Sequence, residues 1–138
     1  MNVKIKQVDG ITLLGKADSS VWIPMDGPAD FGGSEAGVRP IELVLIGLGG
    51  CTSMDVISML KKMRQSVTNF EVDITAERGE EHPKVFTEIH VHYTIHGSGI
   101  DKAKVERAIE LSETKYCGVS AILRETAKIT SDYEIVEA

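Results

Sequence analysis

A long apolar stretch near the middle of the chain constrains the fold more than any other feature. Pro40 is a residue favoured in the first turn of a helix, and the sequence PIELVLIGLGGCTSMDVISMLKKM continues from there to Met63. The first half is apolar almost all round, as expected for a buried helix, and the second half is amphipathic. One continuous helix of this kind would be roughly 37 Å long. We therefore expect the sheets of this 138-residue chain to pack against one long helix.

Three glycines stand within this stretch, at positions 47, 49 and 50. Glycine permits a bend in a helix or a very close approach of another backbone. Cys51 follows the glycines directly. The sequence therefore leaves two readings open, a continuous helix from Pro40 or a local helix start at Cys51.

Three short strands are predicted before the helix. Residues 3–7 alternate apolar and polar side chains, Asp9-Gly10 is a hairpin signal, and residues 11–15 and 21–25 form the next two apolar runs. Residues 26–40 are rich in glycine, proline and small polar residues and are predicted to form a loop. A loop of this length inside a compact domain is often functional.

Two longer strands are predicted after the helix, over residues 69–78 and 84–96. The second should bury one face formed by Val85, Ile89, Val91, Tyr93 and Ile95. Asp101 is expected to cap a helix, a short helix should begin near Cys117, and a final strand ends the chain. The order βββ–α–ββ–αα–β predicts a single α+β domain, residues 1–138, with mostly antiparallel strands.

The charge pattern excludes some classes of partner. The formal net charge is −6 and the basic residues do not cluster, so we expect no nucleic-acid partner. The N-terminal segment MNVKIKQVDG is polar and alternating, without the apolar core of a signal peptide. The longest apolar run, residues 41–51, is about half the length that spans a bilayer. These observations favour a cytoplasmic protein with reduced thiols and no membrane partner.

The two cysteines, Cys51 and Cys117, each stand at the start of a helical pattern. Unpaired N–H groups and the helix dipole at such a start stabilise a thiolate and lower the pKa of a thiol. Cys51 gains little from this effect if the helix is unbroken. Either cysteine could instead be a small buried apolar residue. Their spacing does not match a zinc site, and no Cys-x-x-Cys is present.

The sequence around both cysteines resembles the OsmC and organic hydroperoxide resistance family. The run Pro40-Ile41-Glu42-Leu43 followed by GLGGC resembles the first cysteine motif of that family, and KYCGVSAIL, residues 115–123, resembles the second. Element order and chain length also match. The resemblance implies an OsmC-like α+β fold, with mostly antiparallel sheets packed on a long central helix in an intertwined homodimer.

The resemblance also implies a thiol peroxidase that acts on organic hydroperoxides without a cofactor or a metal. Cys51 would be the peroxidatic thiolate and would become a sulfenic acid. Cys117 would resolve it as a disulfide, and an external dithiol would reduce that disulfide by exchange.

The family also uses a glutamate and an arginine at the reaction centre. The glutamate corresponds to Glu42, although Ile41 separates it from Pro40 here. The N-terminal hairpin region contains Lys16 in place of an arginine, and Arg39 is the arginine nearest to the first motif. These departures leave a second hypothesis, a small-ligand-binding dimer of the same fold that turns over peroxide weakly.

Other polar residues have alternative readings. Three histidines, at positions 90, 92 and 96, share one strand face, and such a set could bind a metal or form a solvated surface. Asp55, four residues after Cys51, could raise the pKa of that thiol, cap a helix start or lie at the surface. Tyr116 could line a pocket beside Cys117.

Overall fold

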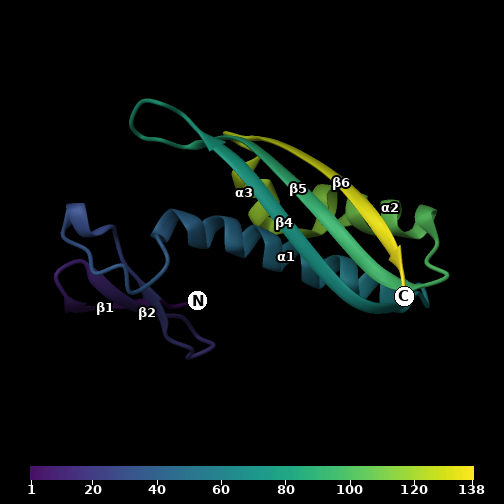
Figure 1. Cartoon of the computed structure of the whole chain (residues 1–138), viewed down its shortest axis with the longest axis horizontal. Coiled ribbons are helices and arrows are strands. Elements are labelled where there is room, and N and C mark those ends of the chain that lie inside the picture. The colour runs from purple at the N-terminus through teal and green to yellow at the C-terminus, as the bar shows by residue number, and fades with distance from the viewer. The chain divides into compact units, whose positions relative to one another are not determined.

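The computed structural model describes residues 1–138 and divides into two compact parts, residues 1–46 and 47–138. Figure 1 shows the elements of both parts along the chain. Helix α1 (Pro40–Lys62) begins in the first part and continues into the second as one uninterrupted helix. The predicted central helix is therefore confirmed.

The first part contains a three-stranded antiparallel sheet in the order β1-β2-β3. Its strands are β1 (Lys4–Asp9), β2 (Thr12–Lys16) and β3 (Ile23–Met25), close to the predicted ranges. Gly10 in the first hairpin has φ +55°, a conformation that glycine adopts without strain. A 3₁₀ turn, η1 (Ala29–Phe31), lies in the predicted loop.

The carboxylate of Asp26 organises that loop. Asp26 is 2% exposed, and its carboxylate accepts hydrogen bonds from the Thr12 hydroxyl at 2.7 Å and from the N–H groups of Ser34 and Ala36, each at 3.1 Å. The bond from Thr12, together with those from the main chain, holds the pKa of Asp26 below its usual range. One ionised carboxylate thus connects β2 to the loop.

The second part contains a three-stranded sheet in the order β4-β5-β6. Strands β4 (Ser66–Arg78) and β5 (Phe86–Ser98) are antiparallel, whereas β5 and β6 (Lys128–Glu137) are parallel. A parallel pair needs a long crossover, and here the helical segment of residues 102–123 supplies it. The sequence predicted mostly antiparallel strands, and the β5–β6 pair is the exception.

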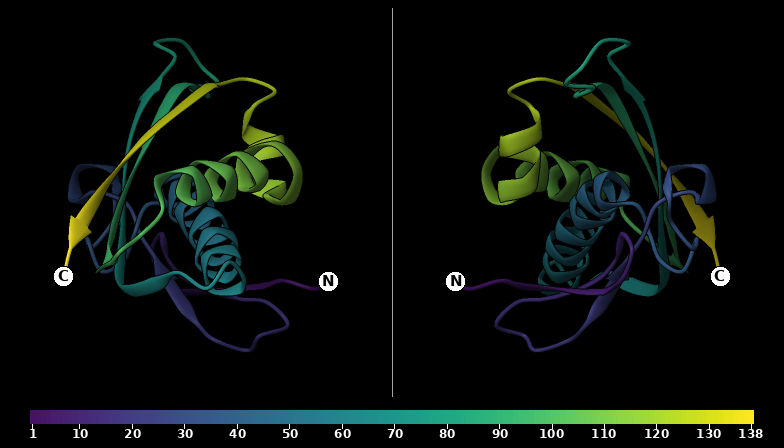
Figure 2. Two further views of the ribbon diagram at one scale, coloured as in Figure 1. Left: turned by 90° about the vertical axis from the view of Figure 1, so that its right-hand side faces the viewer. Right: turned by 90° about the vertical axis from the view of Figure 1, so that its left-hand side faces the viewer.

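Helices cover one face of this second sheet (Figure 2). They are the second half of α1, α2 (Lys102–Leu111), the π-helical turn η2 (Ser112–Tyr116) and α3 (Gly118–Leu123). Asp101 caps α2 as predicted, accepting the Ala103 N–H at 2.9 Å. The side chains that fill the core between helices and sheet include Leu48, Val56, Leu60, Ile89, Val91, Tyr93, Ile95, Val105 and Ala108.

Two predictions about burial were wrong. Val85 is 41% exposed, and Phe86 is buried in its place because the β4–β5 register shifts between Glu77 and Arg78. A bulge of this kind reverses which side chain faces the core. The apolar first half of α1 was expected to be buried, yet Val44 is 38% exposed and Ile46 is 57% exposed.

Candidate functional site

Cys117 caps the start of α3, as the sequence predicted. Its backbone is extended, its sulfur accepts the Ser120 N–H at 3.3 Å, and its own N–H donates to the Ser112 carbonyl at 2.8 Å. The side chain is buried, with 4% exposure. The N-terminus of α3 therefore fixes the position of this sulfur.

Cys51 does not begin a helix, because α1 continues unbroken through the glycines. The position of Gly49 gives a reason for a small residue there. A Cβ at Gly49 would lie 3.2 Å from the Ile74 Cδ1 of strand β4, so glycine allows the helix to pack closely on the sheet. Cys51 is mid-helix and half-buried. It therefore lacks the dipole effect that a helix start at this position would have given.

The two thiols nevertheless lie close enough to affect each other's charge. Burial is the main cause that raises the pKa of Cys51. The neighbouring Cys117 thiol and the negative charge of Asp55 raise it further, whereas the Val119 N–H near the start of α3 lowers it. The lowered pKa that a helix start would give to Cys51 is therefore not found, in agreement with the alternative of an unbroken helix. Among the three readings of Asp55, the one in which its charge raises the pKa of Cys51 is confirmed. The two cysteines are both free thiols.

Asp55 connects the helix of Cys51 to the segment before Cys117. Its carboxylate accepts a hydrogen bond from the Ser112 hydroxyl at 2.9 Å. Ser112 is fully buried at the end of α2. No local sequence pattern indicates this bond, because 57 residues separate its two partners.

A second polar pair lies beside the thiols. The hydroxyl of Tyr93 on β5 donates to the Glu113 carboxylate at 3.2 Å, and the tyrosine is fully buried. Burial is the main cause that raises the pKa of Tyr93, while a hydrogen bond with Thr52 opposes the change. Sequence analysis identified Tyr93 only as a core residue. Its alternation within β5 predicted its burial but not its hydroxyl partner.

The remaining predicted site residues lie in the first part of the chain. Glu42 is in the first turn of α1, where its carboxylate accepts the Arg39 N–H at 2.8 Å, as in a capping box. The Arg39 guanidinium pairs with Glu35 at 3.3 Å. The Lys16 ammonium lies 4.8 Å from the centre of the Trp22 ring. Each of these three residues thus has a local partner within residues 1–46.

The histidines of β5 make ion pairs on the outer face of the sheet. His90 and His92 both contact the Asp132 carboxylate, at 2.9 Å and 2.7 Å. These pairs raise the pKa of His92 and lower that of Asp132. Across residues 1–138, no group of three His, Cys, Asp or Glu side chains has an arrangement that could hold a metal ion.

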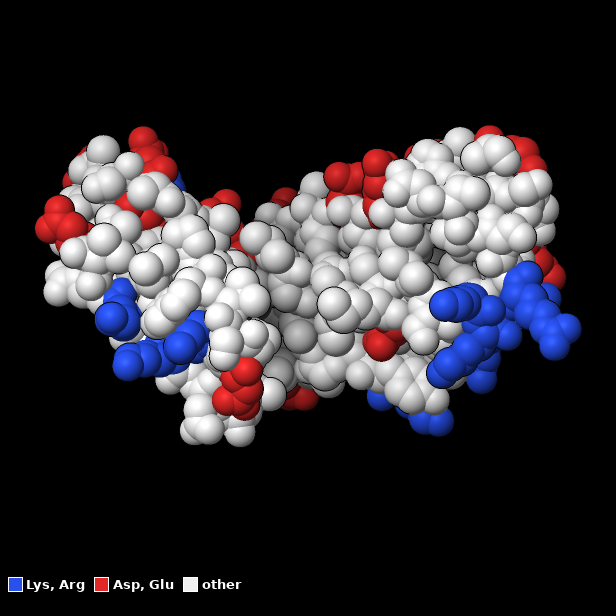
Figure 3. Space-filling view, turned by 90° about the horizontal axis from the view of Figure 1, so that it is seen from below, with Lys and Arg blue, Asp and Glu red and all other residues white.

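A cavity of about 400 Å³ lies beside the second half of α1. It is lined by Asp55, Ser58, Met59, Lys62, Met63, Leu111 and Tyr116. Tyr116 therefore lines a cavity, although neither Cys51 nor Cys117 is among the residues of its wall. Seen from below, Lys and Arg side chains gather over the end of α1, whose last turn carries Lys61 and Lys62 (Figure 3). Positive charge at a helix C-terminus is favourable because of the helix dipole.

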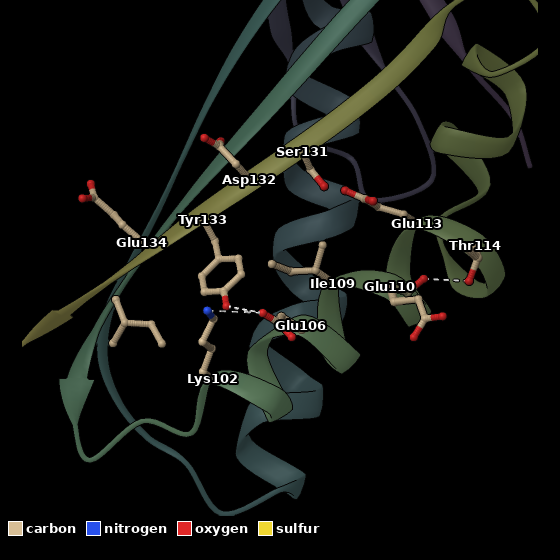
Figure 4. A pocket seen from close by; sticks show the side chains of 11 residues that line it. Lys102, Glu106, Ile109, Glu110, Glu113, Thr114, Ser131, Asp132, Tyr133 and Glu134 are labelled. Carbon is tan, nitrogen blue, oxygen red and sulfur yellow. Dashed lines mark hydrogen bonds and ion pairs between the residues drawn. The ribbon is translucent and has the colours of Figure 1, made fainter.

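A larger groove of about 740 Å³ lies between α2 and β6. In Figure 4, Tyr133 points toward Glu106, and its hydroxyl donates to that carboxylate at 2.7 Å. Burial and this bond raise the pKa of Tyr133 to about 12. Among the charged residues of the lining, five are acidic and one, Lys102, is basic; the acidic ones are Glu106, Glu110, Glu113, Asp132 and Glu134.

Comparison with known proteins places this arrangement in a family. Residues 32–132 match the family model described as OsmC-like protein. The chain is 41% identical to "Protein YhfA" of Escherichia coli strain K12 over 138 residues, which is the full length of both chains.

Solved structures share the fold. A hypothetical protein from Aquifex aeolicus VF5 is 29% identical with a TM-score of 0.87, covering 99% of this chain and 96% of its own. An organic hydroperoxide resistance protein OsmC from Legionella pneumophila is 15% identical with a TM-score of 0.71, covering 96% and 95%. This second likeness concerns the fold alone. From its full-length relatives, its matched family model and its fold, this chain belongs to the OsmC-like protein family.

Proposed function

We propose that the protein is a thiol-dependent peroxidase that reduces organic hydroperoxides. The observation that carries the proposal is the proximity of two free thiols: Cys117 caps the start of α3 and lies close enough to Cys51, on α1, to raise the pKa of that thiol. Cys51 is half-buried and Cys117 is buried, so a peroxide would reach Cys51 first. Membership of the OsmC-like family and the fold shared with organic hydroperoxide resistance proteins support this choice of substrate.

The reaction requires one oxidation of sulfur by the peroxide and one condensation between the two cysteines. The Cys51 thiolate attacks the distal peroxide oxygen, the O–O bond breaks, and the alcohol leaves with the proton that the thiol had carried. The product at Cys51 is a sulfenic acid. The Cys117 thiol then attacks the Cys51 sulfur, water leaves, and a disulfide forms. An external dithiol reduces the disulfide by exchange, and no cofactor or metal takes part.

In this proposal Glu42 orients a cationic donor for the peroxide, as the family resemblance implies. It does so from the second subunit of a homodimer, and Lys16 and Arg39 are the candidate donors. Arginine would present a planar fork of N–H groups, whereas lysine would present a point charge. We further propose that the enzyme works in the cytoplasm, where thiols are kept reduced between turnovers.

The exposed apolar surface supports the homodimer. The most apolar 18-residue stretch of α1 has a mean hydropathy of 1.8, but only 22% of it is buried within the single chain. Met54 and Ile57 on the surface of α1 are 75% and 43% exposed. By length and composition alone, α1 could also cross a membrane. We favour a second copy because β1 also exposes apolar side chains, Ile5 and Val8, although this six-residue strand carries two lysines and is far too short to span lipid.

Sedimentation measurements test the dimer. A dimer in detergent-free buffer is expected, with a mass that stays constant on addition of detergent. A protein that stays in solution only with detergent, or that sediments as a monomer at micromolar concentration, would contradict it.

A second candidate function is a small-ligand-binding dimer that turns over peroxide weakly. The raised pKa of Cys51 favours it, because burial and the charge of Asp55 disfavour the thiolate that attacks peroxide. The cavity beside Tyr116 would then hold the ligand.

One experiment separates the two functions. The reduced protein is treated with a small excess of cumene hydroperoxide, and its thiols are mapped by mass spectrometry at short times. A peroxidase forms a single Cys51–Cys117 disulfide in the wild type, stops at a Cys51 sulfenic acid in Cys117→Ser, and consumes no peroxide in Cys51→Ser. Oxidation no faster than that of free cysteine would reject the peroxidase and favour the ligand-binding dimer.

A further inference from the structure

We infer that Asp55 and Ser112 are positioning residues for Cys117: the hydrogen bond between them fixes the π-helical turn that brings Cys117 to Cys51. The inference deepens the proposed function, because it concerns the step in which the second thiol captures the first. It is carried by the geometry of η2 and by the contacts that hold this turn.

The turn itself is unusual. The five residues of η2, Ser112–Tyr116, form a π-helical turn between α2 and Cys117. Single π turns are rare and are found frequently at functional sites. The closing bond of this turn runs from the Cys117 N–H to the Ser112 carbonyl, at 2.8 Å. The main chain of Cys117 is therefore set directly by the position of Ser112.

Three side-chain hydrogen bonds hold η2 against three different elements. The Ser112 hydroxyl donates to Asp55 on α1, and the Tyr93 hydroxyl on β5 donates to the Glu113 carboxylate. The guanidinium of Arg124, at the end of α3, donates to the Glu113 carbonyl. A five-residue turn with three such bonds has few ways to move.

The hydrogen bond between Asp55 and Ser112 connects the helix that carries Cys51 to the turn that precedes Cys117. Asp55 follows Cys51 by four residues, which places both on the same face of α1 one turn apart. Ser112 donates to Asp55 through its hydroxyl and accepts from Cys117 through its carbonyl. Two consecutive hydrogen bonds thus connect the helix that carries Cys51 to the backbone of Cys117.

This arrangement has opposite effects on the two steps of the reaction. The carboxylate of Asp55 raises the pKa of Cys51 and so slows its first attack. The same carboxylate holds Ser112 and so speeds the capture by Cys117. The charge of Asp55 and its role as a hydrogen-bond acceptor can be separated, because asparagine keeps an acceptor oxygen and removes the charge.

A reaction with 5,5′-dithiobis(2-nitrobenzoate) measures the capture step without any peroxide. The half-buried Cys51, the more accessible of the two thiols, displaces one thionitrobenzoate as its thiolate and forms a mixed disulfide. The Cys117 thiolate then attacks the Cys51 sulfur and releases a second thionitrobenzoate, which leaves the Cys51–Cys117 disulfide. The first release reports the reactivity of Cys51, and the second reports the placement of Cys117. In Cys117→Ser the second release is lost, which assigns the two phases.

Four variants are compared with the wild type. Ser112→Ala removes the bond and keeps the charge, Asp55→Ala removes both, and Asp55→Asn removes only the charge. The matched control is Ser98→Ala, the same chemical change at an exposed position of β5. Circular dichroism and thermal unfolding confirm that each variant is folded. Ser112→Ala and Asp55→Ala remove the same bond from opposite sides, so either one keeps the test valid if the other is unstable.

We expect the second release to slow about tenfold in Ser112→Ala and Asp55→Ala, because small displacements of a reacting group are costly. It should stay within about twofold of wild type in Asp55→Asn and Ser98→Ala. The first release should be faster in both Asp55 variants and unchanged in Ser112→Ala.

Equal rates of the second release in wild type, Ser112→Ala and Asp55→Ala would overturn the inference. So would an Asp55→Asn variant as slow as Asp55→Ala, because the bond would then not be the cause. The outcome is independent of the peroxide experiment. A protein that fails to react with cumene hydroperoxide but shows the expected release rates would reject the proposed function and keep the positioning role.

Discussion

The two parts of the chain are stabilised in different ways. Residues 47–138 enclose an apolar core in which Leu60, Val105 and Ala108 are fully buried. Within residues 1–46 only Gly15 and Asp26 are buried, and the loop is held by hydrogen bonds to one carboxylate. One part is thus stabilised mainly by removal of apolar surface from water, and the other by a polar cluster.

This difference indicates that the first part needs something to cover it. A segment of fewer than 50 residues rarely forms a stable core by itself. Val3, Ile5 and Phe31 are 67%, 52% and 75% exposed, which is surface that an independent soluble domain would bury. If the proposed homodimer forms, the stability of the first part is expected to depend on the second subunit, whereas the core of residues 47–138 lies within one chain.

The largest effect is expected from the core of the second part. Leu60→Ala removes a fully buried side chain of α1 and should lower the free energy of unfolding by about 2–5 kcal/mol. Lys61→Ala, at the exposed neighbouring position, should change it by less than about 0.5 kcal/mol. Urea denaturation measures both. A Leu60→Ala protein as stable as Lys61→Ala would show that this core does not dominate stability.

A smaller and more local effect is expected in the first part. Asp26→Ala removes the acceptor for Thr12, Ser34 and Ala36, so the loop of residues 26–39 should open. Limited proteolysis should then cleave this loop several times faster, while fragments from residues 47–138 persist. Asp30→Ala, an exposed carboxylate in the same loop, is the control. Cleavage spread equally over both parts would contradict the separation between them.

Glu42 gives a prediction at the junction between the two parts. Glu42→Ala removes the acceptor for the Arg39 N–H and should cost about 0.5–1 kcal/mol of stability, measured by urea denaturation. Glu42→Gln keeps an acceptor and should keep stability. If Glu42 also orients the peroxide donor, both variants reduce cumene hydroperoxide more slowly. If peroxide turnover falls only in Glu42→Ala, the variant that also loses stability, then Glu42 only caps the helix and does not orient the donor.

Where the sequence predicted the fold well, the signal was local. Alternation over residues 69–78 identified the half-buried face of β4, because side-chain direction in a strand has a period of two. Cys117 was predicted at a helix start because a short helical pattern follows it directly, and it does cap α3. In both cases the residues that determine the structure are neighbours in the chain.

The sequence failed where distant segments decide the outcome. The glycines before Cys51 suggested a helix start, but at Gly49 the close approach of Ile74 from β4 accounts for a residue without a side chain. The bond between Asp55 and Ser112 and that between Tyr93 and Glu113 depend on packing between elements. Periodicity gives burial, but it does not give the partner of a buried polar group.

The smallest effects should come from pH, and they differ between the two parts. On the outer face of β5, His92 contacts Asp132 and Glu134, His90 also contacts Asp132, and Asp73 of β4 lies opposite His92 in the register. The bond with Asp132 raises the pKa of His92. The stabilisation that protonated His92 adds to the free energy of unfolding is therefore fully present below the ordinary pKa of about 6.5. This stabilisation is lost as the pH rises through the raised pKa of His92.

Asp26 responds in the opposite direction. The bond from Thr12 lowers the pKa of Asp26. The stabilisation that the ionised carboxylate adds to the free energy of unfolding is therefore present above the ordinary pKa of 3.8, and it is lost as the pH falls through the lowered pKa.

Raising the pH from about 6 to about 8 should therefore lower the thermal stability of the second part only, through the loss of charge on His92. His92→Gln should flatten this decline in thermal stability, and His82→Gln, in an exposed turn, should not. Because Asp26 stays ionised throughout this range, the rate of proteolysis in residues 26–39 should remain constant while the decline occurs. An increase in that rate would mean that the outer face of the second sheet also stabilises the first part, and the two would then not be independent.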